Sequence, residues 1–236
     1  MNKKYKSNRR AILILESPWE LDSTDTNRSS VLPFVEGIAK LAGNTDVFHA
    51  NFYDAKSFKQ ALDCLLKIEF DNAIVYVAAH GDSKVIGNVK IIEALVNIGE
   101  RARGKGITGI VLGSCTVGGN TSAIEVCVEG TQLRWAVGYS STTWWLEGTF
   151  IDCSIMANML ELDEDDFSDQ NIMISALAQA IAPFSENYCI GMDESDSNVL
   201  LKDSLQFVIQ PLGRGKRSKL VNDEVFTEVN CIRAEV

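Results

Sequence analysis

Three continuous apolar runs most constrain the fold of this chain: AILIL at residues 11–15, NAIVYVAAH at 72–80 and ITGIVLG at 107–113. Runs without an alternating polar face are typical of parallel strands that are buried on both sides. Between them lie segments with apolar residues at helical spacing, among them residues 31–42 and 91–102. The alternation of strand and helix predicts an α/β fold, a mostly parallel sheet with helices on both faces.

The whole chain, residues 1–236, is expected to form one domain. A chain of this length can bury a core without disulfides, and its sequence contains no internal repeat or convincing linker. Residues 1–10 are basic and predict a flexible tail, whereas residues 151–236 are a less regular second half of the same domain. The acidic run at 161–169 and the basic run at 213–219 are interpreted as solvated loops.

Composition argues against several classes of protein. The net charge of -10 disfavours a nucleic-acid-binding surface, and no apolar run is long enough to cross a bilayer. The six cysteines are dispersed and form no C-x-x-C pair, which disfavours a zinc site or a disulfide framework. We therefore expect a cytoplasmic protein with no metal, no cofactor, and neither nucleic acid nor a membrane as partner.

Two reactive side chains end neighbouring apolar runs. His80, one of the two histidines of the chain, ends the second run, and Cys115 follows the third. The segment between them is long enough for one helical crossover, and a right-handed crossover returns the chain parallel to the first strand. Both side chains would then emerge at the carboxyl edge of the sheet, where sites form in open α/β sheets. A structural histidine is the alternative for His80 taken alone.

Glycines accompany both side chains. Gly81 follows the histidine and allows the backbone to approach a ligand closely. The N–H groups of Gly81 and Cys115 could stabilise an oxyanion. A helix that begins after Gly118 and Gly119 would favour the thiolate form of the cysteine. A cysteine with a positioned base is the general arrangement for acyl transfer.

In this order and spacing, the His-Gly and Gly-Ser-Cys motifs resemble those of the caspase-like cysteine peptidases, which include caspases, metacaspases, separases and bacterial CHAT domains. The segment AVGYSSTTWW at residues 136–145 adds to the resemblance, which covers about residues 11–160. The family implies a three-layer sandwich. The sequence GSCTV departs from the caspase pentapeptide around the cysteine, and the acidic residue of metacaspases is replaced by Gly113 and Ser114.

The resemblance implies a cysteine endopeptidase acting on protein substrates. His80 would be the general base and acid, Cys115 the nucleophile that forms a thioester, and Gly81 part of the oxyanion hole. Two loops would bind the substrate, one after the first strand and one after the GYS strand. Carboxylates outnumber the arginine there, which favours Arg or Lys before the scissile bond, whereas Arg28 would favour an acidic residue. The candidates are Asp22, Asp25, Arg28, Ser140, Trp144, Trp145, Glu147 and Asp152.

Two other functions remain open from the sequence. A catalytically silent caspase-like scaffold would usually lose the histidine or the cysteine, and this chain keeps both. A non-peptidase thiol hydrolase or acyltransferase would use the same dyad on another substrate. By analogy with bacterial relatives, the protein is expected to be a stress or antiphage effector. It would be latent until a partner protein or a small nucleotide-type signal activates it.

Overall fold

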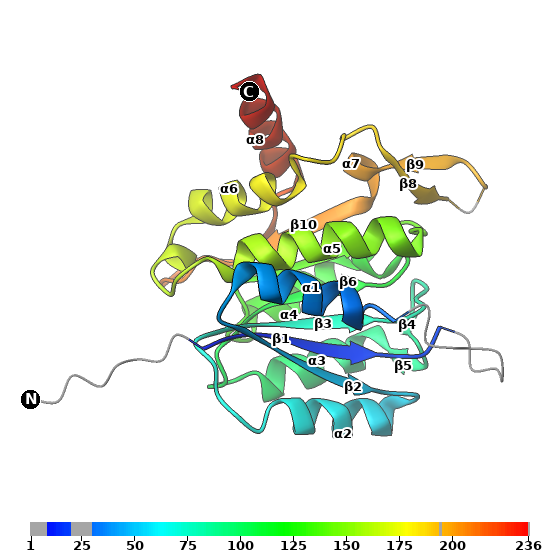
Figure 1. The fold of residues 1–236 in the computed structure, drawn as a ribbon, viewed down its shortest axis with the longest axis vertical. Coiled ribbons are helices and arrows are strands. Elements are labelled where there is room, and N and C mark those ends of the chain that lie inside the picture. Colours follow the sequence, from blue (N-terminus) through cyan, green and yellow to red (C-terminus); the bar gives the residue numbers. More distant parts are fainter. Residues whose placement is uncertain (1–8, 20–29, 194, 236) are drawn as a thin grey trace, which may run out of the picture.

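A seven-stranded sheet forms the centre of the molecule in the computed structural model, which describes residues 9–19, 30–193 and 195–235 (Figure 1). Its strands run in the order β11-β10-β7-β6-β3-β1-β2. The strands are β1 (Arg10–Glu16), β2 (Thr45–Asn51), β3 (Asn72–Ala78), β6 (Ile107–Gly113), β7 (Trp135–Tyr139), β10 (Leu205–Ile209) and β11 (Lys219–Leu220).

The sheet is parallel from β2 to β7 and antiparallel at the other edge. β1 pairs in parallel with β2 and with β3, and β6 pairs in parallel with β3 and with β7. β10 runs antiparallel to β7, and the short β11 runs antiparallel to β10. The mostly parallel sheet expected from the apolar runs is therefore confirmed.

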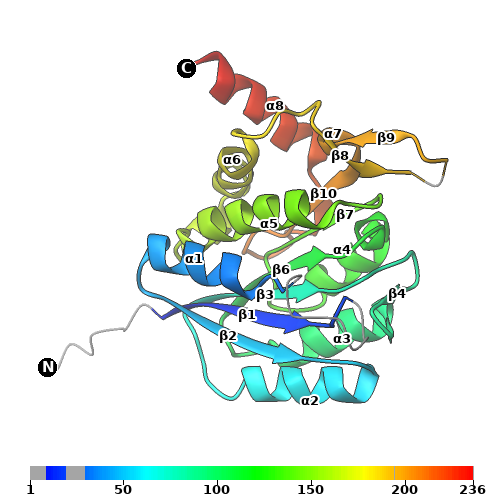
Figure 2. The same cartoon turned by 45° about the vertical axis from the view of Figure 1, so that its right-hand side comes forward.

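Helices cover both faces of the sheet, as the two views in Figures 1 and 2 show. One layer contains α1 (Leu32–Ala42), α5 (Trp145–Leu160), α6 (Gln170–Ile181) and α8 (Asn222–Ala234), which contact one another in that order. The opposite layer contains α2 (Ala55–Leu65), α3 (Ile91–Arg101) and α4 (Thr121–Glu129). The predicted three-layer α/β sandwich is confirmed.

Short elements complete the fold at the edges of these layers. Two hairpins lie outside the main sheet, and three short helices connect longer elements. They are β4 (Val85–Ile86) with β5 (Val89–Lys90), β8 (Cys189–Met192) with β9 (Asn198–Leu200), η1 (Val117–Gly119), η2 (Asp166–Ser168) and α7 (Leu201–Ser204). In the described residues, no helix has the length and apolar character needed to span a membrane.

Alternation along the central strands divides the core into two clusters. In β1, Ile12 and Ile14 pack under the layer of α5, whereas Ala11, Leu13 and Leu15 pack under the layer of α2. Successive side chains of a strand point to opposite faces, so a fully apolar strand supplies both clusters.

The second half of the chain shares this sheet and one of the two clusters. β10 pairs with β7, and α5, α6 and α8 form most of one helical layer. The sequence predicts a substrate-binding loop after the GYS strand, but α5 begins at Trp145, directly after the short loop that follows β7. This earlier start changes the location of several candidate residues.

Candidate active site

His80 and Cys115 occupy matching positions at the carboxyl edge of the sheet. Ala78 at the end of β3 pairs with Gly113 at the end of β6, and each reactive residue comes two positions later. The expectation that these strands are parallel neighbours is confirmed. Adjacent strands lie about 4.8 Å apart, so the two side chains emerge from neighbouring points of one edge. Both stand just beyond their strands, not within them.

Gly81 is packed against the backbone that carries the cysteine. A Cβ atom on Gly81 would lie 2.7 Å from the carbonyl oxygen of Cys115 and 2.9 Å from the Cβ of Ser114. No side chain can be accommodated at that distance without movement of the backbone. The glycine that follows the histidine therefore allows the two chain segments to come together.

Two amide donors are free beside the thiol. Within the described part of the chain, no hydrogen bond uses the N–H of Gly81 or the N–H of Cys115. Thr116 follows the cysteine with a positive φ of 61°, and the N–H of Val117 donates to the carbonyl of Cys115 at 2.8 Å. This tight turn leads through η1 into α4, which begins at Thr121, after Gly118 and Gly119 as the sequence predicts.

The thiol of Cys115 contacts the loop that follows β7. The N–H of Thr143 donates to Sγ at 3.4 Å, and the thiol donates to the carbonyl of Thr143 at 3.7 Å. The same loop is held by the β8–β9 hairpin, because the N–H of Trp144 donates to the carbonyl of Ile190 at 2.9 Å. The cysteine is therefore half-buried under a loop that the β8–β9 hairpin holds in place by this hydrogen bond.

The imidazole of His80 is exposed and rests against Trp19. The two ring centroids are 4.6 Å apart with an interplanar angle of 79°. No described residue, Cys115 included, forms a hydrogen bond with the ring of His80. The two reactive residues thus occupy neighbouring positions of the sheet edge without a hydrogen bond between them, and catalytic hydrogen bonds often form only when substrate binds.

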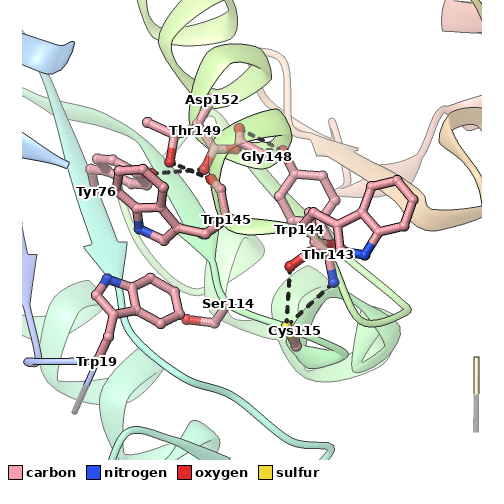
Figure 3. Close-up of a pocket in the computed structure, with 12 residues that line it drawn as sticks. Trp19, Tyr76, Ser114, Cys115, Thr143, Trp144, Trp145, Gly148, Thr149 and Asp152 are labelled. Carbon is pink, nitrogen blue, oxygen red and sulfur yellow. Dashed lines mark hydrogen bonds between the residues drawn. The ribbon is translucent and has the colours of Figure 1, made fainter. Parts of the chain in front are cut away.

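A narrow cavity, which we call the Cys115 cavity, opens beside the thiol (Figure 3). Its volume is about 20 Å³, which is room for about one water molecule. Twelve residues from five segments line it: Trp19, Tyr76, Gly113, Ser114, Cys115, Tyr139, Thr143, Trp144, Trp145, Gly148, Thr149 and Asp152.

Asp152 forms the floor of the cavity with two tyrosines. The carboxylate is 1% exposed and accepts hydrogen bonds from the hydroxyls of Tyr139 at 2.7 Å and Tyr76 at 2.9 Å. Burial raises the pKa of Asp152 to about 7, although both tyrosine hydrogen bonds act to lower it. Burial, and after it the nearby carboxylate, raises the pKa of each tyrosine well above its usual value.

The walls of the cavity hold polar atoms without partners. Four buried atoms, from Trp19, Ser114, Thr143 and Trp145, have no hydrogen-bond partner among the described residues. They are the two indole Nε1 atoms and the two hydroxyl oxygens. In Figure 3 the nitrogen ends of the Trp19 and Trp145 indoles are turned toward one another. Buried polar groups are usually paired, so these atoms suggest that a polar group or water occupies the cavity when it is filled.

A wider groove lies on the other side of the cysteine turn. It has a volume of about 690 Å³ and runs between the turn after His80, the loop after β7 and the β8–β9 hairpin. It is lined by Asp82, Ser83, Thr116, Gly119, Asn120, Ser140, Ser141, Thr142, Met192, Asp193 and Ser195. Cys115 thus lines the narrow cavity, and its neighbour Thr116 lines the wider groove.

The structure brings together only part of the predicted substrate-binding set. Trp144, Trp145 and Asp152 line the Cys115 cavity, and Ser140 lines the groove. Glu147, on the first turn of α5, lines neither. Asp22, Asp25 and Arg28 lie outside the described residues.

The sequence interpretation of this segment needs one correction. The resemblance places Trp145, Glu147 and Asp152 in a loop, but the helix α5 carries them. We also expect the two adjacent tryptophans to point opposite ways, so that one of them lines a cleft. In Figure 3 the indole of Trp145 faces that of Trp19, whereas the indole of Trp144 is turned to the opposite side.

Several residues of the site are absent from the sequence predictions. Tyr76 and Tyr139 lie in buried strands that read as apolar core, and Trp19 lies in a polar loop. One signal was available at Gly113, a glycine at the end of a buried strand. A Cβ there would lie 2.6 Å from the ring of Tyr76 and 2.7 Å from the carboxylate of Asp152.

Comparisons with known proteins show structural likeness at low sequence identity. No protein-family model and no curated protein sequence matches the chain. The solved structures that resemble it include the Arg-specific cysteine proteinase gingipain R, with a TM-score of 0.46 and 10% identity over 77% of this chain. A complex of the pro- and mature domains of Porphyromonas gingivalis RgpB gives the same TM-score and identity over 75% of this chain. The chain spans 43–44% of the length of these neighbours, so the case for a function depends on the geometry of the site itself.

Proposed function

We propose that the protein is a cysteine endopeptidase that cleaves after a basic residue. One observation carries the proposal. Cys115 stands beside two amide N–H groups that have no partner among the described residues, with a carboxylate at the floor of its cavity and a groove of about 690 Å³ next to it. His80 lies at the matching position of the next strand.

In the proposed reaction, His80 takes the thiol proton and the thiolate of Cys115 attacks the carbonyl carbon of the scissile bond. The N–H groups of Gly81 and Cys115 stabilise the oxyanion that develops. His80 then gives the proton to the leaving amine, and a thioester remains on the sulfur. Water, deprotonated by His80, hydrolyses the thioester and regenerates the thiol.

The floor of the Cys115 cavity supports a basic side chain before the scissile bond. An ionised Asp152 would pair with a guanidinium or ammonium group, and each of its oxygens has a lone pair left after the tyrosine hydrogen bonds. The indole of Trp145 lines the same space and can hold a cation over its face.

The groove favours a peptidase over a hydrolase of small esters. It extends the site past the cysteine turn and has polar side chains and two carboxylates, Asp82 and Asp193, along its length. The pKa of Asp193 is lowered mainly by a hydrogen bond from the Ser195 hydroxyl. Hydrogen bonds from the N–H groups of Ser197 and Ser195 lower it further. An extended chain with further basic residues would find complementary charge there.

A latent resting state fits the size of the cavity. Room for about one water molecule cannot accept an arginine, so the walls must move before the enzyme can act. We infer that an activating partner or small nucleotide-type signal drives this change. Cytoplasmic placement and a role in stress or antiphage defence stay predictions from the family resemblance.

The proposal is tested by cleavage of an Arg- and Lys-containing peptide library by the wild type, Cys115→Ala and His80→Ala, with mass-spectrometric mapping of the cut sites. Both variants should lose activity by at least ~10³-fold, since removal of either member of a nucleophile–base pair removes their joint action. Cys64→Ala, at an exposed cysteine on α2, is the matched control and should retain full activity. Cleavage by Cys115→Ala at the wild-type rate would exclude the assignment.

A further inference from the structure

The crevice between β1 and β3 is where the chain reverses its winding. The loop after β1 leads to α1 on one face of the sheet, whereas β3 is followed by α3 on the opposite face. Adjacent strands whose connections leave in opposite directions open a crevice at their carboxyl ends, and ligands bind there in open α/β sheets. Trp19 follows β1 and His80 follows β3, so their contact lies in this crevice.

Trp19 contacts both functional parts of the site. One part is the imidazole of His80, at a centroid distance of 4.6 Å in an edge-to-face arrangement. The other is the Cys115 cavity, where the indole forms a wall on the same side as Trp145 (Figure 3). Its Nε1 atom is buried and has no hydrogen-bond partner in the described chain.

The imidazole of His80 has little else to hold it. The side chain is exposed, and the hydrogen bonds recorded for the residue in the described chain involve its backbone, where the N–H of Gly87 donates to its carbonyl. An exposed side chain without a partner populates several rotamers. The aromatic contact with Trp19 therefore sets which of them the ring adopts.

We propose that Trp19 is a positioning residue that holds His80 toward Cys115 and makes the base respond to what fills the cavity. A side chain that packs in the cavity would press on one face of the indole and fix it. The indole in turn would fix the imidazole, so binding of the correct residue would complete the catalytic pair. This inference rests on the proposed peptidase function for its consequence in turnover, but the contact between Trp19 and His80 can be tested without any substrate.

The substrate-free test is the rate of alkylation of Cys115 by iodoacetamide, followed by mass spectrometry of the modified peptide. His80→Ala sets the rate without a base. Trp19→Leu keeps a smaller apolar side chain without an aromatic face and should slow alkylation roughly three- to tenfold, the range expected for loss of one aromatic contact. Trp19→Phe keeps an aromatic ring and should stay within about twofold of the wild type.

Tyr188→Leu is the matched control. Tyr188 is an exposed aromatic residue that lines neither the Cys115 cavity nor the groove, so the alkylation rate of this variant should equal that of the wild type. An equal loss in Tyr188→Leu and Trp19→Leu would overturn the proposal, because the effect would then not depend on the contact with His80. An unchanged rate in Trp19→Leu would overturn it as well.

A double-mutant cycle separates positioning from a merely structural role. In the His80→Ala background, Trp19→Leu should cause no further loss, since the indole acts through the imidazole. A further loss of the same size would overturn the proposal. Should Trp19→Leu fail to fold, the wild type and Trp19→Phe are compared instead, and a loss above about threefold in Trp19→Phe would count against it.

Turnover of peptide substrates gives the second readout. Trp19→Leu should lower kcat, whereas Trp144→Ala should mainly raise KM. A wild type that cleaves no peptide but shows the alkylation cycle would refute the peptidase and leave the role of Trp19 standing. Peptide cleavage with identical kcat in wild type and Trp19→Leu would refute the role of Trp19 and leave the peptidase standing.

Discussion

The floor and the walls of the Cys115 cavity differ in how their polar groups are satisfied. At the floor, the two oxygens of Asp152 each accept a tyrosine hydroxyl. On the walls, four buried polar atoms from Trp19, Ser114, Thr143 and Trp145 are without partners in the described chain. A floor whose polar groups are already hydrogen-bonded is preorganised. Walls that contain unpaired donors and acceptors instead gain their hydrogen bonds from a ligand. The difference indicates which residues should control charge and which should control fit.

The sharpest way to break this comparison is Asp152→Asn, which removes the charge of the floor and keeps its shape. If the cavity takes a cation, an uncompensated buried charge then costs about 3–5 kcal/mol. The specificity constant for Arg and Lys substrates should fall roughly 10²- to 10³-fold, measured as kcat/KM with matched peptides. Alkylation of Cys115 should be unchanged, because the carboxylate does not contact His80. Equal kcat/KM values of the two proteins for Arg and Lys substrates would show that the floor does not select charge.

The same variant should be more stable than the wild type at alkaline pH. The folded-state pKa of Asp152, about 7, lies above the usual value of 3.8. The contribution of this carboxyl to stability is therefore complete below pH 3.8 and is lost as pH rises through about 7. Asparagine has no such loss, so thermal unfolding at pH 8 should favour Asp152→Asn by up to roughly 4 kcal/mol. The difference should vanish near pH 4, and a constant difference would contradict a buried, titrating carboxyl.

Binding of a cation should depend on pH through the floor alone. Benzamidine, a cation that is not cleaved, needs the same movement of the cavity walls as a substrate. The cost of that movement lowers its affinity by the same factor at every pH, so the pH dependence of binding, measured by isothermal titration calorimetry, still reports the floor. Affinity should rise about tenfold per pH unit up to about pH 7 and level off above it, because only ionised Asp152 attracts the ligand. Asp152→Asn should bind weakly at every pH. A slope that persists in this variant would assign the titration to another group.

How much of this site the sequence predicts can be judged from individual residues. His80, Gly81 and Cys115 are predictable because strand ends and crossover length are local features, and parallel pairing then places the residues at one edge. Asp152 is named from its charge, but its depth depends on where α5 begins. Trp19 and the two tyrosines are missed because the cavity forms from segments far apart in the sequence, and periodicity carries no information about such packing.

A smaller change at the floor tests whether the tyrosines keep Asp152 ionised. In the wild type, a hydrogen bond from Tyr139 to one oxygen of the carboxylate lowers the pKa of Asp152. Tyr139→Phe removes this hydrogen bond. The pKa of Asp152 should rise further, and the pH at which benzamidine binding levels off should move upward. Affinity at pH 7 should fall about tenfold, the worth of one hydrogen bond to a charged group. An unchanged pH profile would show that Tyr139 fills space only.

The walls should respond in the opposite sense, and with the smallest effect. Ser114 is 2% exposed, and its hydroxyl has no hydrogen-bond partner among the described residues. A buried hydroxyl without a partner costs about 1–3 kcal/mol of stability, so Ser114→Ala should be neutral or stabilising by about 1 kcal/mol in thermal unfolding. If a substrate group completes this hydrogen bond, kcat/KM should fall only a few-fold, with the loss in KM. Floor variants such as Tyr139→Phe lose binding through charge, whereas this wall variant would lose it through fit. A destabilised Ser114→Ala would mean that the hydroxyl already has a hydrogen-bond partner within the protein. The walls would then not differ from the floor in how their polar groups are satisfied.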